Sequence, residues 1–290
     1  MNIINAFLFF VLIVFTGIFP FFLIYGISNF LRFLLYSIVG YRRIVIISNL
    51  QKVYPHWDKN QLRRMEKLVY NNLADVFIEG IKAFSMTPRQ VLRRHKVMNP
   101  DVLNQFYRSG RSVIGVTAHY CNWEWGSLSA SLQTEFNTVA FYKRIDNPYI
   151  DRFVRANRSK FGTTLASISE TAKTFEDYKN IPTAFLMAAD QRTIRSKLDE
   201  AYWVNFLGIE TPFLHGPEKY ARAYNLPVIY IDVQRKRRGF YEIELSVLTD
   251  NPSELPEGEI TRRYAKKLEE VIHKQPENWL WSHRRWKFTR

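Results

Sequence analysis

The 290-residue chain has little cysteine and few acidic side chains. Its single cysteine, Cys121, excludes a disulfide within the chain, so cysteine usage gives no indication of an oxidising compartment. Aspartate and glutamate total 27 against 41 lysines and arginines, which gives a formal charge of +14. Such an excess of positive charge favours an anionic partner: nucleic acid, an acidic protein or an anionic lipid surface. The chain also has no internal repeat and no low-complexity tract.

Charge is absent from the first 31 residues, since Arg32 is the first charged side chain. The apolar run Ala6–Ile27 has 22 residues, about the length that a helix needs to cross a bilayer core of ~30 Å. A secretory signal peptide would start with basic residues and have a shorter apolar core. We therefore favour a retained membrane anchor. Pro20, close to Gly17, allows a kink or a re-entrant hairpin in place of a straight span.

Basic residues follow the apolar run but do not precede it. Because positively charged flanks stay in the cytoplasm, Arg32, Arg42, Arg43 and Lys52 indicate that the rest of the chain faces the cytoplasm. We expect an anchor over residues 1–40 and one catalytic domain over residues 41–290. The amphipathic segment Asn29–Val39 is suited to the membrane interface. Together these features favour a lipid surface over nucleic acid as the anionic partner.

Beyond the anchor, strand-like and helix-like segments alternate. Residues 48–84 have apolar side chains at helical spacing, and residues 87–90 have the form of a capping box with proline at the first helical position. Strands are expected at 112–117, 138–142, 183–188, 227–233 and 241–247, and helices at 123–133, 148–161, 169–178, 217–224 and 259–274. This alternation predicts an α/β fold in which a mixed, mostly parallel sheet is flanked by helices, with an N-terminal transmembrane or re-entrant helix.

A histidine and a glutamate stand five positions apart just after the expected strand at 112–117. His119 lies at the carboxyl end of that strand, and Asn122 is suited to cap a helix that carries Glu124 in its first turn. In such a pair the carboxylate fixes the tautomer of the imidazole, which can then deprotonate a hydroxyl for attack on an acyl carbonyl. By spacing alone, a structural hydrogen bond between the two side chains is the commoner explanation.

Basic and acidic residues at other strand ends are further candidates. Arg144 ends the expected strand at 138–142, and Arg155 and Arg158 share a helix face that is suited to hold a phosphate, although most such runs are solvated helix faces. Asp190 follows the strand at 183–188 directly. It is either an orienting group in the same cleft as His119 or a cap for backbone amides.

Three other features are more ambiguous. Cys121 lies inside the histidine motif, but cysteine usually packs as a small hydrophobic residue. His215 has no acid nearby in the sequence and is interpreted as structural. The carboxyl end mixes three tryptophans with basic residues, a composition that fits single-stranded nucleic acid, a membrane interface or packing against the core.

Four segments, in order along the chain, resemble the bacterial lipid A biosynthesis (late, or secondary) acyltransferases. They lie at residues 115–126, 147–162, 189–191 with 206–208, and 281–287. The His-x4-acid box alone is shared with the wider superfamily of glycerolipid acyltransferases. The glutamate as acid, the preceding Asn-Trp and the ending rich in tryptophan and arginine are similar to the narrower family.

The resemblance implies an inner-membrane enzyme that takes a fatty acyl group from a thioester on acyl carrier protein or coenzyme A. The acceptor is a hydroxyl of an acylated glucosamine disaccharide, and neither a metal nor another cofactor takes part. By motif position His119 and Glu124 become the catalytic pair, Arg158 a ligand for phosphate or the oxyanion, and Asp190 a supporting polar residue. Arg144 and Arg155 are candidates for the same binding role from their charge alone.

Two alternatives stay open at this point. In one, the same chemistry serves a lysophospholipid or another glycolipid, because a fold does not fix its substrate. In the other, the chain is a non-catalytic basic membrane protein, a possibility raised by its charge and its carboxyl end.

Overall fold

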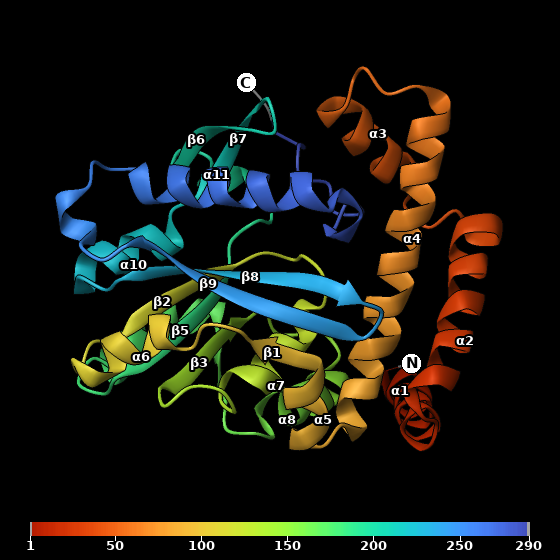
Figure 1. Ribbon diagram of the computed structural model, residues 1–290, viewed down its shortest axis with the longest axis horizontal. Coiled ribbons are helices and arrows are strands. Elements are labelled where there is room, and N and C mark those ends of the chain that lie inside the picture. Colours follow the sequence, from red (N-terminus) through yellow and green to blue (C-terminus); the bar gives the residue numbers. More distant parts are fainter. Residues whose placement is uncertain (1, 289–290) are drawn as a thin grey trace.

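A seven-stranded mixed sheet forms the centre of the computed structural model, which describes residues 2–288 (Figure 1). Five neighbouring strands run parallel, β9 is antiparallel to β8, and β1 is parallel to β9. The predicted α/β fold with a mostly parallel sheet is therefore confirmed. In spatial order the strands are β1 (His95–Val97), β9 (Phe240–Thr249), β8 (Val228–Arg237), β2 (Val113–Thr117), β5 (Thr183–Ala188), β3 (Asn137–Tyr142) and β4 (Thr164–Ser167).

Helices cover both faces of this sheet. One face carries α10 (Gly216–Tyr224), α11 (Glu259–Lys274) and a separate hairpin of β6 (Ala201–Phe206) and β7 (Ile209–Leu214) (Figure 1). The remaining α-helices of the domain are α3 (Arg43–Val53), α4 (Lys59–Lys82), α5 (Pro88–Arg94), α6 (Asp101–Arg108), α7 (Gly126–Ala130), α8 (Pro148–Ser159) and α9 (Thr171–Asp177).

The 24-residue helix α4 stands beside the end of the sheet to which β8 points (Figure 1). It starts with a capping box formed by Asp58 and Gln61. Four polar residues on its buried side, Asn72, Asp75, Glu79 and Lys82, contact other parts of the chain. The segments that follow β2 and β8 contact α4, since Asn122 donates to Glu79 and Arg238 donates to Asp75.

The apolar N-terminal run is broken between α1 (Asn2–Ile18) and α2 (Phe21–Phe33), at Pro20. Proline cannot donate to the preceding turn, so carbonyl groups at the end of α1 are left open. The ammonium group of Lys82 donates to three of them, on Thr16, Gly17 and Phe19, at 2.9–3.2 Å. The helix is broken at Pro20, so Ala6–Ile27 is not one continuous helix.

The longest apolar helix instead combines α2 with the π-helical turn Leu34–Val39. Within residues 2–288, Phe21–Val39 is the one helix long and apolar enough to cross a membrane. One side of it is attached to the domain, since Tyr25 donates to Glu79 at 2.8 Å and Ser28 donates to Asp75 at 2.6 Å. The opposite side exposes apolar side chains, with Phe22 73% accessible.

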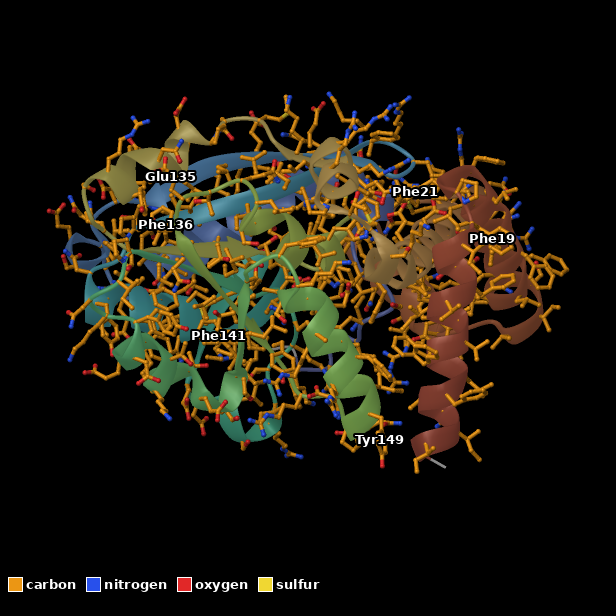
Figure 2. The ribbon with its side chains drawn as sticks, turned by 90° about the horizontal axis from the view of Figure 1, so that it is seen from below. Phe19, Phe21, Glu135, Phe136, Phe141 and Tyr149 are labelled. Carbon is orange, nitrogen blue, oxygen red and sulfur yellow. The ribbon has the colours of Figure 1, made fainter. Side chains whose placement is uncertain are left out.

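Helix α1 lies beside α8 at the same end of the molecule. The rings of Phe10 and Phe153 stack at 5.9 Å between centroids. Figure 2 shows Tyr149 at the tip of α8 and Phe19 among the N-terminal helices, both away from the sheet that carries Phe141. The exposed apolar side chains of α1, α2 and α8 therefore belong to one end of the molecule.

The expected elements differ from the observed ones in three places. Four strands, β1, β4, β6 and β7, were not predicted. The expected helix at 123–133 is a 3-10 turn (Trp123–Trp125) followed by the short α7, and residues 48–84 divide into α3 and α4. The capping box at Thr87 and the helix at 259–274 are confirmed.

Candidate functional site

Two neighbouring parallel strands bring His119 and Asp190 together. The last residues of β2 and β5, Thr117 and Ala188, are register partners, and the amide of Ala189 donates to the carbonyl of Thr117 at 3.1 Å. His119 lies two residues after Thr117, and Asp190 lies two residues after Ala188. Both side chains therefore leave the same edge of the sheet. Polar side chains beyond the carboxyl ends of parallel strands are a common arrangement in active sites.

The imidazole of His119 is held by a buried carboxylate. Nδ1 lies 2.7 Å from Oδ1 of Asp190, and Oδ2 of Asp190 accepts the indole N–H of Trp279 at 3.0 Å. The Asp190 side chain is 3% exposed, whereas His119 is 20% exposed. Because an ionised carboxylate only accepts hydrogen bonds, the proton sits on Nδ1 and the lone pair on Nε2.

The two pKa values shift in the directions expected for this pair. Burial lowers the pKa of His119, but the charge and hydrogen bond of Asp190 outweigh it, and the net pKa lies above 6.5. Burial raises the pKa of Asp190, yet its contacts with His119 and Trp279 prevail and the net pKa is lowered. Asp190 is thus ionised at neutral pH, and its charge favours the protonated form of His119.

The reactive nitrogen of His119 faces the surface. Nε2 of His119 lies 3.0 Å from Nε2 of Gln191, whose side chain is exposed. Because the lone pair is on Nε2 of His119, the amide of Gln191 is the donor in this contact. A hydroxyl that replaces this amide would meet the lone pair of the imidazole at hydrogen-bond distance. The arrangement meets the geometric requirement for a general base.

Glu124 does not make the contact that we expected of it. Asn122 caps the turn at Trp125, as predicted, but the carboxylate of Glu124 binds Arg158, with Nη2 at 2.7 and 3.0 Å from its two oxygens. The orienting hydrogen bond to His119 comes from Asp190 instead. The reason is geometric, because the 3-10 turn directs Glu124 toward α4, where it packs near Gly80.

Arg158 brings a positive charge to the same site from α8. Its side chain is 25% exposed, and its charge lowers the pKa of His119, while that of Glu124 raises it. The helix is fixed two residues later, where the ammonium group of Lys160 donates to the carbonyls of Ala83, Phe84 and Met86 just beyond α4. Two motifs that are distant in sequence therefore meet as an ion pair.

A buried glutamate that we did not predict, Glu79, forms hydrogen bonds with the turn that follows His119. Oε2 of Glu79 accepts from the side chains of Asn122 at 2.6 Å and Tyr241 at 2.7 Å, while Oε1 accepts from Tyr25. Its carbonyl accepts the indole N–H of Trp125 at 3.0 Å. Glu79 is fully buried, and burial raises its pKa. This carboxylate joins α2, α4, β9 and the turn after His119.

The remaining candidates lie apart from this centre. Arg144 forms an exposed ion pair with Glu170 at 3.5 Å, and Arg155 is exposed on α8. Within residues 2–288 neither contacts His119, Glu124 or Asp190, so their binding role stays a prediction. Cys121 is buried, and burial raises the pKa of its thiol well above the usual range, which fits a packing residue.

The tryptophans of the carboxyl end pack into the core. Trp279, Trp281 and Trp286 are each no more than 6% exposed, and the guanidinium of Arg285 is buried against the carbonyl of Pro212. Among the three roles that composition allowed, packing against the core is the one observed. Within the described residues, no group of three or more histidine, cysteine, aspartate or glutamate side chains forms a metal-binding cluster.

The family model described as bacterial lipid A biosynthesis acyltransferase matches residues 2–288, which is nearly the whole chain. No curated protein matches the chain significantly.

Proposed function

The chain belongs to the bacterial lipid A biosynthesis acyltransferases, and we propose that it is a membrane-bound O-acyltransferase that acylates a hydroxyl of a lipid A precursor. The observation that carries this proposal is the contact between His119 and Asp190, which leaves Nε2 as an acceptor at the surface. The acyl donor is a thioester on acyl carrier protein or coenzyme A. No metal or other cofactor takes part in the proposed reaction.

The reaction begins when Nε2 of His119 removes the proton from the acceptor hydroxyl. The oxygen attacks the thioester carbonyl, and a tetrahedral oxyanion forms. When this intermediate collapses, the C–S bond breaks, and the proton held by His119 passes to the leaving thiolate. Asp190 keeps the imidazole in the reactive tautomer and stabilises the imidazolium.

Arg158 is the proposed donor to the oxyanion, with Glu124 holding its guanidinium in place. The ion pair is partly exposed, and the guanidinium has further N–H groups that Glu124 does not engage. A preorganised positive group directed at a developing oxyanion contributes on the order of 10²–10³ in rate. Glu124 is accordingly a positioning residue in this mechanism.

The proposed location is the inner membrane, with the catalytic domain facing the cytoplasm. Support comes from the apolar side chains exposed on α1 and α2, including Ile3, Phe7, Phe22 and Phe30 at 60–75% accessibility. Charges that follow the apolar helices, and do not precede them, support the orientation. We propose residues 1–40 as the membrane-contacting part and an anionic lipid surface as the partner.

The purified full chain tests this proposal in detergent with an acyl thioester and a lipid A precursor. We expect mass spectrometry to detect one added acyl chain, and His119→Ala to lower the rate about 10²–10⁴-fold. His215→Ala is the matched control, since His215 contacts a backbone carbonyl and lies outside the site. Transfer to a lysophospholipid but not to the precursor would overturn the assigned acceptor. Wild-type transfer by the folded His119→Ala protein would overturn the mechanism.

A further inference from the structure

A basic cavity of about 680 Å³ lies beside the proposed active site. Its volume is within the range of ~300–1,000 Å³ that small-molecule sites occupy. The cavity lies between the start of α3, the loop after Asp190 and the carboxyl end of the chain. It is lined by Gly40, Arg42, Arg43, Ile44, Val45, Arg192, His283 and Arg284.

The lining of this cavity carries positive charge and no acidic side chain. Arg43 is paired with Glu66 at 2.8 Å, and Arg42 donates to the carbonyl of Ser282 at 3.0 Å. Within residues 2–288, no acidic side chain forms an ion pair with Arg192 or Arg284. Two guanidinium groups are thus free to bind an anion, and their planar donors match the oxygens of a phosphate group.

Helix α3 adds to the positive electrostatic potential of the cavity. It starts at Arg43, and its N-cap residue Arg42 makes no side-chain capping hydrogen bond. Its first-turn residues Ile44 and Val45 line the cavity. The amino end of a helix carries partial positive charge and open amides, so it favours an anion beside the two arginines.

The mouth of the cavity is next to exposed apolar residues. Ile44, which lines the cavity, is 86% accessible, and the neighbouring Ile38 and Val39 are each 65% accessible. In a membrane surface, the acyl chains lie next to the layer of phosphate groups. Apolar side chains suit the acyl chains, and guanidinium groups suit the phosphates. A lipid can therefore place its phosphate in the cavity while its acyl chains stay in the membrane.

The cavity connects to the base through three consecutive residues. Asp190 and Gln191 contact His119, and the amide of Arg192 donates to Nε2 of His283 at 3.1 Å. Burial lowers the pKa of His283 to about 4, so its ring is neutral and accepts this bond. A ligand in the cavity would be bound directly next to the hydroxyl that His119 deprotonates.

We propose that Arg192 and Arg284 bind a phosphate group of the lipid acceptor and so set which hydroxyl reaches His119. The inference rests on the proposed acyltransfer function and extends it to the acceptor's headgroup. It identifies the ligand as a membrane lipid that bears a phosphate near the reacting hydroxyl.

Equilibrium binding measures this without any turnover. The full chain in an uncharged detergent is titrated with a phosphorylated, acylated glucosamine disaccharide and, separately, with the dephosphorylated form. Native mass spectrometry measures the bound fraction. Arg192→Gln/Arg284→Gln is compared with Arg195→Gln/Lys287→Gln, which removes the same charge from nearby exposed positions. We expect the first double variant to bind the phosphorylated lipid roughly 10- to 100-fold more weakly, and the control to bind like the wild type.

Phosphatidylglycerol and coenzyme A test whether the cavity binds a phosphate from another source. Phosphatidylglycerol that binds as tightly as the phosphorylated disaccharide, and loses affinity in the same variant, would overturn the assignment to the acceptor, because the site would then take any phospholipid. Equal loss in both double variants, or equal affinity for both forms of the disaccharide, would overturn the proposal. Competition by coenzyme A that depends on Arg192 and Arg284 would also overturn it, because the cavity would then bind the donor. Because binding is measured alone, failure of acyl transfer leaves this result intact.

Discussion

Nδ1 of His119 lies 2.7 Å from Oδ1 of Asp190, although 71 positions separate the two residues in the chain. The contact exists because β2 and β5 are neighbours in register, so both side chains emerge beyond the same edge. Glu124, only five positions from His119, instead binds Arg158 at 2.7 Å. The site thus contains two pairs of side chains. Asp190 raises the pKa of His119, and Glu124 holds the guanidinium of Arg158 in place.

Asp190→Asn is expected to reduce kcat/KM by about 10²–10⁴, because the amide can present its NH2 group to Nδ1 and favour the wrong tautomer. Only neutral His119 can accept a proton, and its pKa lies above 6.5 in the wild type. The acid limb of the pH–rate profile should therefore lie above pH 6.5. In the variant the charge of Asp190 is lost while burial still lowers the pKa of His119, so the remaining activity should extend to lower pH. An unchanged acid limb in a folded variant would contradict the assigned pair.

A double-mutant cycle tests the pair of Glu124 and Arg158. Glu124→Gln and Arg158→Gln should each lower kcat by about 10²-fold or more, and the double variant should lose little beyond either single one, because the residues act as a unit. The exposed pair Lys236–Glu242 provides the matched control, and its removal should leave kcat unchanged. Fully additive losses at Glu124 and Arg158 would show that the two act independently. A loss of activity in an Arg144→Gln variant would support the predicted role of Arg144 in binding.

The sequence placed both His119 and Asp190 beyond the carboxyl ends of strands, but it left open whether Asp190 lies in the same cleft as His119 or caps backbone amides. Each follows a short apolar run, and the carboxyl ends of parallel strands share one edge of a sheet. The sequence was not sufficient to pair them, because the partner of Nδ1 depends on strand register and on the direction of the turn at Asn122. Local spacing favoured Glu124, five positions away, and that preference was wrong for the hydrogen bond to Nδ1. The short strands β1 and β4 were missed because three or four residues carry no measurable periodicity.

Glu79 was missed although the sequence contains a signal for it. Polar residues recur at positions 72, 75, 79 and 82, a helical spacing, and all four are at most 5% exposed. A polar stripe on a buried helix face indicates partners elsewhere in the chain, since unpaired buried polar groups are costly. Which partners these are depends on tertiary contacts, among them Tyr25, Asn122 and Tyr241, that no local pattern specifies.

Glu79→Ala is expected to lower the free energy of unfolding by about 3 kcal/mol, because it leaves several buried donors without an acceptor. For a chain of this size that corresponds to a fall in Tm of roughly 6–10 °C, measured by thermal unfolding in detergent. Glu254→Ala removes an exposed glutamate and should change stability by less than about 0.5 kcal/mol. Equal Tm values for the two variants would show that the Glu79 network contributes nothing measurable.

Gly239 lies against α2, where its missing side chain leaves room for the hydroxyl of Tyr25. It lies in the β8–β9 turn at φ +73°, and a Cβ there would overlap the hydroxyl of Tyr25 and lie 3.0 Å from Nη1 of Arg94. Gly110 has a similar φ of +71° but open space around it. Gly110→Ala should therefore cost only the backbone term of about 1 kcal/mol, whereas Gly239→Ala should cost more and loosen α2.

Limited proteolysis distinguishes loosening of α2 from a general loss of stability. Gly239→Ala should increase tryptic cleavage at Arg32 and Arg42, which flank the end of the N-terminal helical segment, while Gly110→Ala should not. Tyr25→Phe in the Gly239→Ala background removes the overlapping hydroxyl and should restore part of the protection, although it also removes the hydrogen bond to Glu79. Identical cleavage patterns in the two alanine variants would mean that α2 is held by the rest of α4 and not by this turn.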